Sequence, residues 1–263
     1  MDNKLKSELK ESLRFSIRKF FEKKKGELKT SNILDILFPE ERRIRSLIGG
    51  LETSMGIVWQ AIAITLAKQN GFSILDENQT LMPNPFPPNL RQSLNQLIES
   101  RINGTLIPTN KCVQELKTIA HSIDRSQLKF IAPPPGHGID VHLKKGSTEY
   151  LFDIKSPQPN QGDIPRYTRQ LLEWHAYKYA KNPSLQIEAR IAFVYNPFQK
   201  NWYDHQKSKI SNLLDKDKDI YVGDEFWNFC SGEENTWEKL KTLFSELREE
   251  NFNEEFQDIF KEP

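Results

Sequence analysis

Two acids and a lysine carry the clearest chemistry in this sequence: Asp140, Asp153 and Lys155. Two carboxylates held about 5 Å apart repel by about 3 kcal/mol at an effective dielectric of about 20, so such a pair keeps a proton or recruits a cation. Mg²⁺ suits carboxylate oxygens and completes its octahedron with water and phosphate oxygens. A bound metal acidifies water, and a lysine can hold a non-bridging oxygen or orient the attacking water. The pattern predicts phosphodiester hydrolysis with Mg²⁺ as cofactor.

A predicted β-hairpin brings these groups together. Two short runs rich in β-branched and aromatic residues are separated by the sequence Lys145-Gly146-Ser147-Thr148, which is a hairpin signal. With Gly146-Ser147 as a two-residue type II′ turn, Lys145 pairs with Thr148, and Asp140 then lies opposite Asp153. Side chains alternate along a strand, so Asp153 and Lys155 share a face, about 7 Å apart.

The same residues allow a simpler interpretation, in which an Asp-x-Lys pair is merely the charged face of a solvated sheet edge. A possible third carboxylate is Glu52, within a predicted helix that contains Gly49, Gly50 and Gly56. Each glycine costs up to about 1 kcal/mol in a helix, which indicates close approach of another backbone or of a ligand. Glu52 is then a candidate metal ligand and catalytic group, or else an ordinary exposed glutamate.

Composition indicates a folded globular protein. The chain has 263 residues, 37% of them apolar, with five Trp and sixteen Phe, which is ample for a large core. The charged start of the chain and the lack of an apolar run of eighteen residues argue against secretion and membrane spanning. Two cysteines without nearby metal-ligand spacing indicate core thiols of a reducing cytosol. A net charge of +1 neither supports nor excludes a nucleic-acid partner.

Hydrophobic periodicity predicts an order of elements. We expect helices over residues 4–29, 40–69, 90–102, 113–123 and 166–180, a loop over 82–88, a strand over 187–195 and a helical tail from 204. No repeat or linker is evident. We therefore expect one endonuclease domain over 1–263, made of an N-terminal helical extension (1–40), a catalytic core (41–200) and a C-terminal helical segment (201–263).

The residues after Lys155 form a polar, proline-punctuated loop and then a helix. Amide side chains can bond base edges bidentately and arginines can clamp phosphates, although Asn and Pro also simply build loops. His142 could contact a phosphate, but a strand histidine is more often structural. The candidate DNA-binding residues are Gln158, Asn160, Gln161, Arg166, Arg169 and His142.

Several separated motifs extend the pattern beyond the hairpin. They are the segment 42–56 with Gly49-Gly50-Leu51-Glu52, the strand Tyr150–Lys155 with the following Pro159-Asn160 and Gly162-Asp163, Leu171-Leu172-Glu173-Trp174, Tyr195-Asn196-Pro197-Phe198, and Val222–Trp227. In this order they resemble type II restriction endonucleases of the TdeIII family, in the PD-(D/E)XK nuclease superfamily. The resemblance covers most of the chain from residue 40 onward.

The resemblance implies a mixed α/β (α+β) fold with a restriction-endonuclease-like core, in which helices flank a mixed central sheet and further helices form an N-terminal part. It implies a Mg²⁺-dependent homodimer in the prokaryotic cytoplasm that cuts double-stranded DNA at a short palindrome, GGNCC or a close relative. A DNA methyltransferase of the same restriction–modification system would be its functional partner. The family's catalytic positions fall on Asp140, Asp153 and Lys155, with Glu52 at an added helical glutamate. Ile139 replaces the proline that names the motif.

Two other functions remain open at this point. A structure-selective repair or junction-resolving nuclease would use the same fold, and branched DNA substrates would distinguish it from a sequence-specific enzyme. A non-catalytic DNA-binding module would carry the acids without metal chemistry, and a calcium titration of DNA binding would distinguish it.

Overall fold

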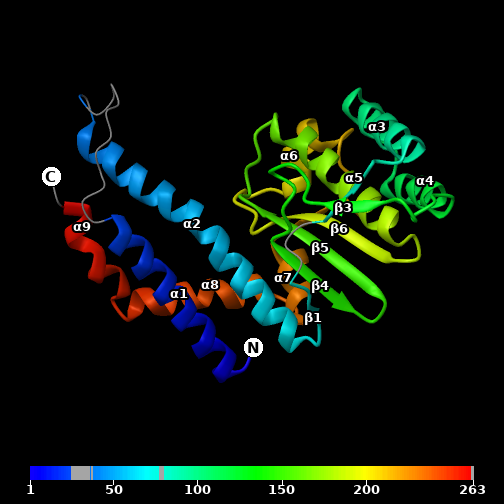
Figure 1. The fold of residues 1–263 in the computed structure, drawn as a ribbon. Helices are drawn as coiled ribbons and strands as arrows, with labels where there is room; N and C mark the ends of the chain where they lie inside the picture. Colours follow the sequence, from blue (N-terminus) through cyan, green and yellow to red (C-terminus); the bar gives the residue numbers. More distant parts are fainter. Residues whose placement is uncertain (25–35, 37, 77–79, 262–263) are drawn as a thin grey trace. The chain divides into compact units, whose positions relative to one another are not determined.

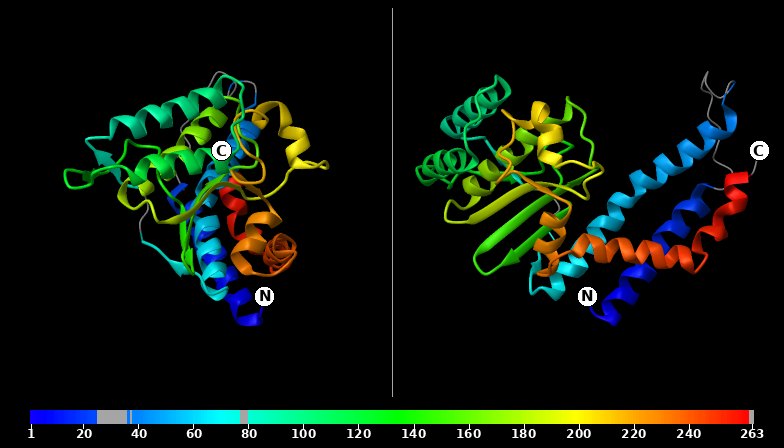
Figure 2. Two further views of the ribbon diagram at one scale, coloured as in Figure 1. Left: turned by 90° about the vertical axis from the view of Figure 1, so that its right-hand side faces the viewer. Right: turned by 180° about the vertical axis from the view of Figure 1, so that it is seen from behind.

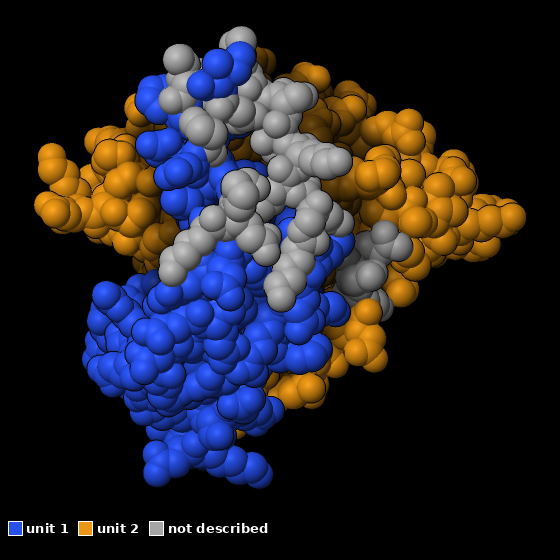
Figure 3. Space-filling model, turned by 90° about the vertical axis from the view of Figure 1, so that its left-hand side faces the viewer, with its two compact units in different colours: residues 1–62, 233–263 blue, residues 63–232 orange. Residues whose placement is uncertain are grey.

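The computed structural model describes residues 1–24, 36, 38–76 and 80–261. The described chain divides into two compact units, residues 1–62 with 233–263 and residues 63–232 (Figure 3). The expectation of one endonuclease domain with its three parts stays a prediction. The expected mixed α/β class, with N-terminal helices and a mixed sheet flanked by helices, is confirmed.

The first unit consists of helices. They are α1 (Asn3–Lys24), the first part of α2 (Pro39–Gln69), α8 (Thr236–Glu249), the 3₁₀ helix η2 (Phe252–Phe256) and α9 (Gln257–Lys261) (Figure 1). Basic residues of α1 form ion pairs with acidic residues after residue 245; Lys10 bonds Glu246 at 3.2 Å and Arg18 bonds Glu255 at 2.7 Å. The helix predicted over 4–29 is present as α1 as far as Lys24, and residues 25–29 lie outside the described part.

The glycines of α2 have different surroundings. A Cβ at Gly50 would meet the ring of Phe20 at 3.2 Å, so α1 approaches α2 closely there. Nothing lies within 4 Å of the positions that a Cβ would take at Gly49 or Gly56. The expected close approach of another backbone is therefore not found at these three glycines among the described residues, since the neighbour of Gly50 is a side chain of α1.

Helix α2 is long and apolar enough over Glu40–Gln69 to cross a membrane by length and composition. Mostly buried core helices of soluble proteins satisfy the same criterion; α2 buries Leu47, Val58, Ile62 and Leu66, but only 28% of its most apolar stretch is buried inside the protein. The expectation that no segment spans a membrane therefore stays a prediction.

The second unit is built on a five-stranded sheet. Its strands are β1 (Ser73–Ile74), β4 (Val141–Lys145), β5 (Thr148–Lys155), β6 (Gln186–Phe193) and β7 (Ile220–Val222), in the spatial order β1-β4-β5-β6-β7. The β1–β4 and β4–β5 pairs are antiparallel, whereas β5–β6 and β6–β7 are parallel. The carboxyl ends of β5 and β6 therefore meet at one edge, with Lys155 beside Phe193.

The predicted hairpin register is confirmed. Lys145 pairs with Thr148 and Val141 with Phe152. Gly146 has a φ of +61°, while Ser147 keeps a negative φ, as the type II′ turn requires. The turn thus fixes which residues of β4 and β5 face each other.

Helices cover both faces of this sheet (Figure 1, Figure 2). On one face lie α3 (Pro88–Ile102), α4 (Thr109–His121) and α5 (Asp163–Lys181), whose apolar side chains form a core with Leu151, Ile191 and Phe193. The other face carries α7 (Asp224–Ser231), whose Phe226 and Phe229 pack on Phe152. A further helix, α6 (Trp202–Ile210), places Trp202 against Phe193.

Two expectations about local structure are wrong. Met82–Asn84 forms strand β2, which pairs with β3 (Lys129–Ile131) in a separate two-stranded sheet, although a loop was expected over 82–88. Pro83 is tolerated because a two-stranded sheet has only edge strands. The tail after residue 204 is not wholly helical either, since Ile220–Val222 adds β7 to the main sheet. Three residues are too few to show a strand periodicity.

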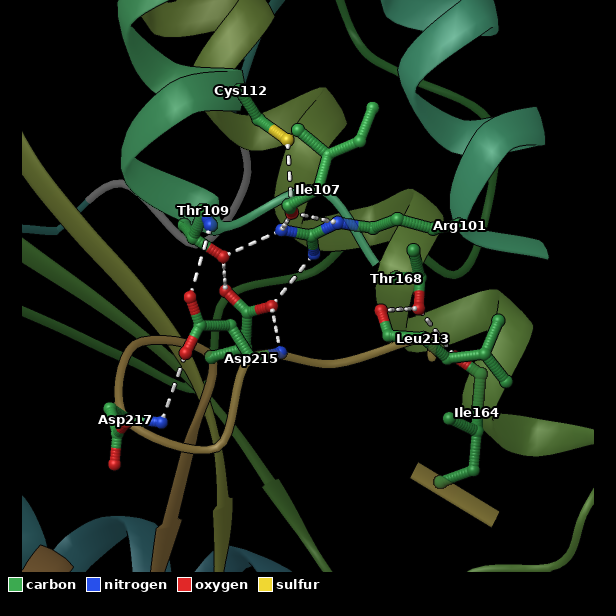
Figure 4. A network of polar contacts seen from close by, with 10 residues as sticks. Arg101, Ile107, Thr109, Cys112, Ile164, Thr168, Leu213, Asp215 and Asp217 are labelled. Atoms are coloured by element: carbon green, nitrogen blue, oxygen red, sulfur yellow. Dashed lines mark hydrogen bonds and ion pairs between the residues drawn. The ribbon is translucent and has the colours of Figure 1, made fainter. Parts of the chain in front are cut away.

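A buried charge network joins α3, the start of α4 and the segment before β7 (Figure 4). Arg101 donates to Asp219 at 2.8 Å, and both side chains are at most 1% exposed. Arg101 also donates to the Ile107 carbonyl and to Thr109, whose hydroxyl donates to Asp219. The pair therefore has the surrounding hydrogen bonds that a buried ion pair requires.

The buried histidine of α5 gives a pH prediction. His175 is 2% exposed and stacks on Tyr179, and burial, with smaller contributions from Arg101 and Lys117, lowers its pKa to about 4. The unfolded chain takes up this proton near pH 6.5, whereas the folded protein resists it, so stability should fall as the pH drops from about 6.5 through 4.

Denaturant titrations at pH 7 and pH 4 should show about 3 kcal/mol more acid destabilisation in the parent than in His175→Phe. Equal pH dependence in the two proteins would contradict a neutral, buried His175.

Candidate active site

The two predicted catalytic acids lie side by side at the start of β4 and near the end of β5. The strand ladder ends at Val141 opposite Phe152, which places Asp140 immediately beyond it. The Asp140 backbone N–H donates to the Phe152 carbonyl at 2.9 Å. Its carboxylate accepts the backbone N–H of Ile154 at 2.7 Å. Asp140 is thus fixed to β5 from both its backbone and its side chain.

Asp153 is the buried member of the pair. It is 4% exposed, and its Oδ2 is enclosed without a hydrogen-bond partner among the described residues. Its Oδ1 accepts a bond of 2.5 Å from the ammonium group of Lys155, which is partly exposed. Burial raises the pKa of Asp153 to about 7, Lys155 opposes the rise, and the neighbouring Asp140 carboxylate adds to it.

These groups fit a hard divalent cation. An enclosed carboxylate oxygen without a donor, beside a second carboxylate, is a site where a cation would replace the missing partner. Mg²⁺ commonly uses only one or two carboxylates. No cluster of three or more His, Cys, Asp or Glu suited to a metal occurs in the part of the chain that the structure describes. Glu52 is exposed on α2, in the other unit, and its metal role stays a prediction.

The loop after Lys155 alternates buried and exposed residues. Pro157 and Pro159 are buried, and their carbonyls accept bonds from Trp202 at 2.8 Å and from Lys209 at 3.1 Å. The side chains between and after them are exposed, namely those of Gln158, Asn160 and Gln161. The predicted base-reading amides therefore project from a loop whose backbone is tied to α6.

The other candidate DNA contacts lie in different settings. Arg166 and Arg169 are exposed on the first turns of α5; Arg166 bonds Asp163 at 3.0 Å and Arg169 lies 4.0 Å from Glu173. His142 is 3% exposed and its Nε2 lies 3.3 Å from Glu149, which also accepts from Lys178 at 3.1 Å. A phosphate contact by His142 stays a prediction, and it would require exposure of a ring that is now buried.

Helix α5 makes contacts near the site that the sequence reasoning did not identify. Trp174 Nε1 donates to the His137 carbonyl at 3.1 Å, and Gln170 donates to the Gly138 carbonyl at 3.2 Å. Glu173 bonds the ring of His137. Burial raises the pKa of Glu173, and His137 and then Arg169 oppose the rise. The signal available in the sequence was the i, i+3, i+4 spacing of these three residues on one helix.

Comparison with known proteins agrees with the hairpin chemistry. Residues 1–248 match the family model described as type II restriction endonuclease, HinfI. The chain therefore belongs to the HinfI family of type II restriction endonucleases. The expectation that the chain belongs to the type II restriction endonucleases is thereby confirmed.

Individual relatives are also described as type II restriction enzymes. The chain is similar to the type II restriction enzyme MjaII of Methanocaldococcus jannaschii, with 25% identity over 80% of this chain and 56% of the relative. It is also similar to HgiCII and HgiEI of Herpetosiphon aurantiacus, with 32% and 27% identity over 41% of this chain and 39% of each relative. The chain thus matches well under two thirds of the length of each. No solved structure matches it significantly.

Proposed function

We propose that this protein is a Mg²⁺-dependent type II restriction endonuclease that hydrolyses double-stranded DNA at a short palindromic site, GGNCC or a close relative. The observation that carries the proposal is the enclosed, unpartnered oxygen of Asp153 beside Asp140 and Lys155, in a chain of the HinfI family. An acid pair that merely coated a solvated edge would be exposed, whereas Asp153 is 4% exposed.

Each residue has a role that its setting supports. Asp153 and Asp140 would hold the metal ion, which when bound acidifies a water and offsets charge on the phosphorus. Lys155, partly exposed and already oriented by Asp153, would donate to a non-bridging phosphate oxygen or to the attacking water. Glu52 is proposed as an added acidic ligand.

DNA recognition is proposed for the exposed side chains around the same edge. Gln158, Asn160 and Gln161 would approach base edges from their anchored loop, and Arg166 and Arg169 would bind phosphates. Ion pairs of Arg166 and Arg169 with nearby acids are exposed and therefore weak, so phosphate can compete for both guanidinium groups.

The wider proposals rest on the family and on the earlier resemblance. They are membership of the PD-(D/E)XK superfamily and of its TdeIII branch, a homodimer whose two sites address opposite strands, a cognate methyltransferase in the same system, and a place in the prokaryotic cytoplasm. Two opposed sites would account for cleavage of both strands of a palindrome.

Digestion of a fully sequenced, unmethylated plasmid tests this proposal. With Mg²⁺ the protein should give discrete fragments, and run-off sequencing of their ends should give one palindrome. No fragments, or a smear with random ends, would contradict a site-specific enzyme. Preferential cutting of branched DNA over plain duplex would instead favour a junction nuclease.

A further inference from the structure

Three side chains of α5 form hydrogen bonds with the segment that leads into Asp140. Gln170, Glu173 and Trp174 lie one helical turn apart, and all three bond the two consecutive residues His137 and Gly138. Trp174 is fully buried and Gln170 is 4% exposed, so packing inside the protein holds both side chains in place. These contacts lie two and three residues before Asp140.

The segment before Asp140 lies outside the regular β4 ladder, with an isolated β-bridge at Gly138 and a buried Ile139 as its other supports. Residues 132–137 contain no strand, and Gly136 adopts a φ of +97° in a turn. The regular ladder of β4 begins only at Val141. Asp140 therefore sits between a well-ordered strand on one side and a segment secured from α5 on the other.

The His137 ring adds a side-chain contact to this attachment. Its Nδ1 lies 2.9 Å from the Pro134 carbonyl, and its Nε2 lies against the Glu173 carboxylate. The ring therefore uses both of its nitrogens, one toward the turn at Pro134 and one toward α5. The ring thereby links α5 to the turn before Gly138.

We propose that Glu173, Trp174 and Gln170, acting through His137 and Gly138, are positioning residues that hold the Asp140 carboxylate where it binds the metal ion. The inference rests on the proposed function. Mg²⁺ and Mn²⁺ require near-octahedral geometry with ligand distances of about 2 Å, so displacement of one carboxylate weakens binding even when the fold is intact. Partners that orient metal ligands typically contribute about ten- to a hundredfold to metal affinity.

Mn²⁺ binding to the DNA-free protein tests the inference without any need for turnover. Free Mn²⁺ is measured by electron paramagnetic resonance for the parent, Glu173→Gln, Trp174→Phe and Gln170→Met. Trp174→Phe and Gln170→Met each remove one donor with a close change in shape, and Glu173→Gln removes the carboxylate charge beside His137. Arg125→Met is the matched control, because Arg125 secures the opposite end of α5 by donating to the Ala180 carbonyl at 3.0 Å.

We expect about tenfold weaker Mn²⁺ binding in Glu173→Gln and Trp174→Phe, a smaller loss in Gln170→Met and no change in Arg125→Met. At saturating Mn²⁺ the variants should regain DNA cleavage to within about threefold of the parent, which a general loss of folding would not allow. Denaturant titrations check that all variants are folded. If Trp174→Phe does not fold, the Mn²⁺ affinity of Glu173→Gln alone tests the inference.

The outcomes separate this inference from the proposed function. If the parent binds Mn²⁺ in a manner that Asp153→Asn abolishes, while Glu173→Gln and Trp174→Phe bind as tightly as the parent, the positioning role is wrong and the metal site stands. If the parent itself binds no Mn²⁺, both are overturned.

Discussion

Replacement of Lys155 by methionine should slow DNA cleavage by about a hundred- to a thousandfold, the usual cost of removing one donor to a developing charge. Methionine keeps most of the volume but removes the ammonium group that now bonds Asp153 and lies next to the candidate metal site. The measurement is the single-turnover cleavage rate of a defined duplex at saturating Mg²⁺ and excess enzyme.

Lys144→Met is the matched control, since Lys144 is an exposed lysine of the adjacent strand β4. It should cleave within about threefold of the parent, as surface substitutions away from a site usually have small effects. Equal rates for Lys155→Met and Lys144→Met would mean that Lys155 takes no part in the reaction.

Replacement of Asp219 by alanine should lower the free energy of unfolding by about 3–5 kcal/mol, because it leaves the buried Arg101 guanidinium without a counter-charge. Thr109 would lose the acceptor for its hydroxyl, and the Asp215 backbone N–H would lose its partner at 2.8 Å. Urea denaturation measures the change.

Two further variants establish the cause. Asp217→Ala changes an exposed acid in the same segment and should cost less than about 0.5 kcal/mol. The double variant Arg101→Met with Asp219→Leu removes both charges, and it should recover much of the stability that the single change loses. If Asp219→Ala is as stable as the parent, breaking the Arg101–Asp219 ion pair does not lower the free energy of unfolding, which contradicts the prediction.

The hairpin was predictable from sequence because local chemistry determines it. One glycine with a positive φ set the turn, and counting outward gave the register that brings Asp140 to Asp153. The long helices were predictable for a similar reason, since their apolar positions recur over many turns.

The short elements and the tertiary contacts were not predictable in the same way. β7 is three residues long, and its place beside β6 depends on packing between distant segments. The burial of Asp153 depends likewise on helices that cover the sheet. The contacts of Glu173 and Trp174 with His137 join residues 36 and 37 positions apart. Helical spacing shows that the two side chains share a face of α5, but not which distant segment they meet.

The most direct test of the central claim is Mg²⁺-dependent cleavage of unmethylated duplex DNA by Asp153→Asn beside the parent protein. Asparagine matches the aspartate in shape but cannot supply the anionic oxygen that now lies enclosed without a partner. The account predicts discrete fragments from the parent and none above background from a folded Asp153→Asn protein. Cleavage by Asp153→Asn at the parental rate would contradict it.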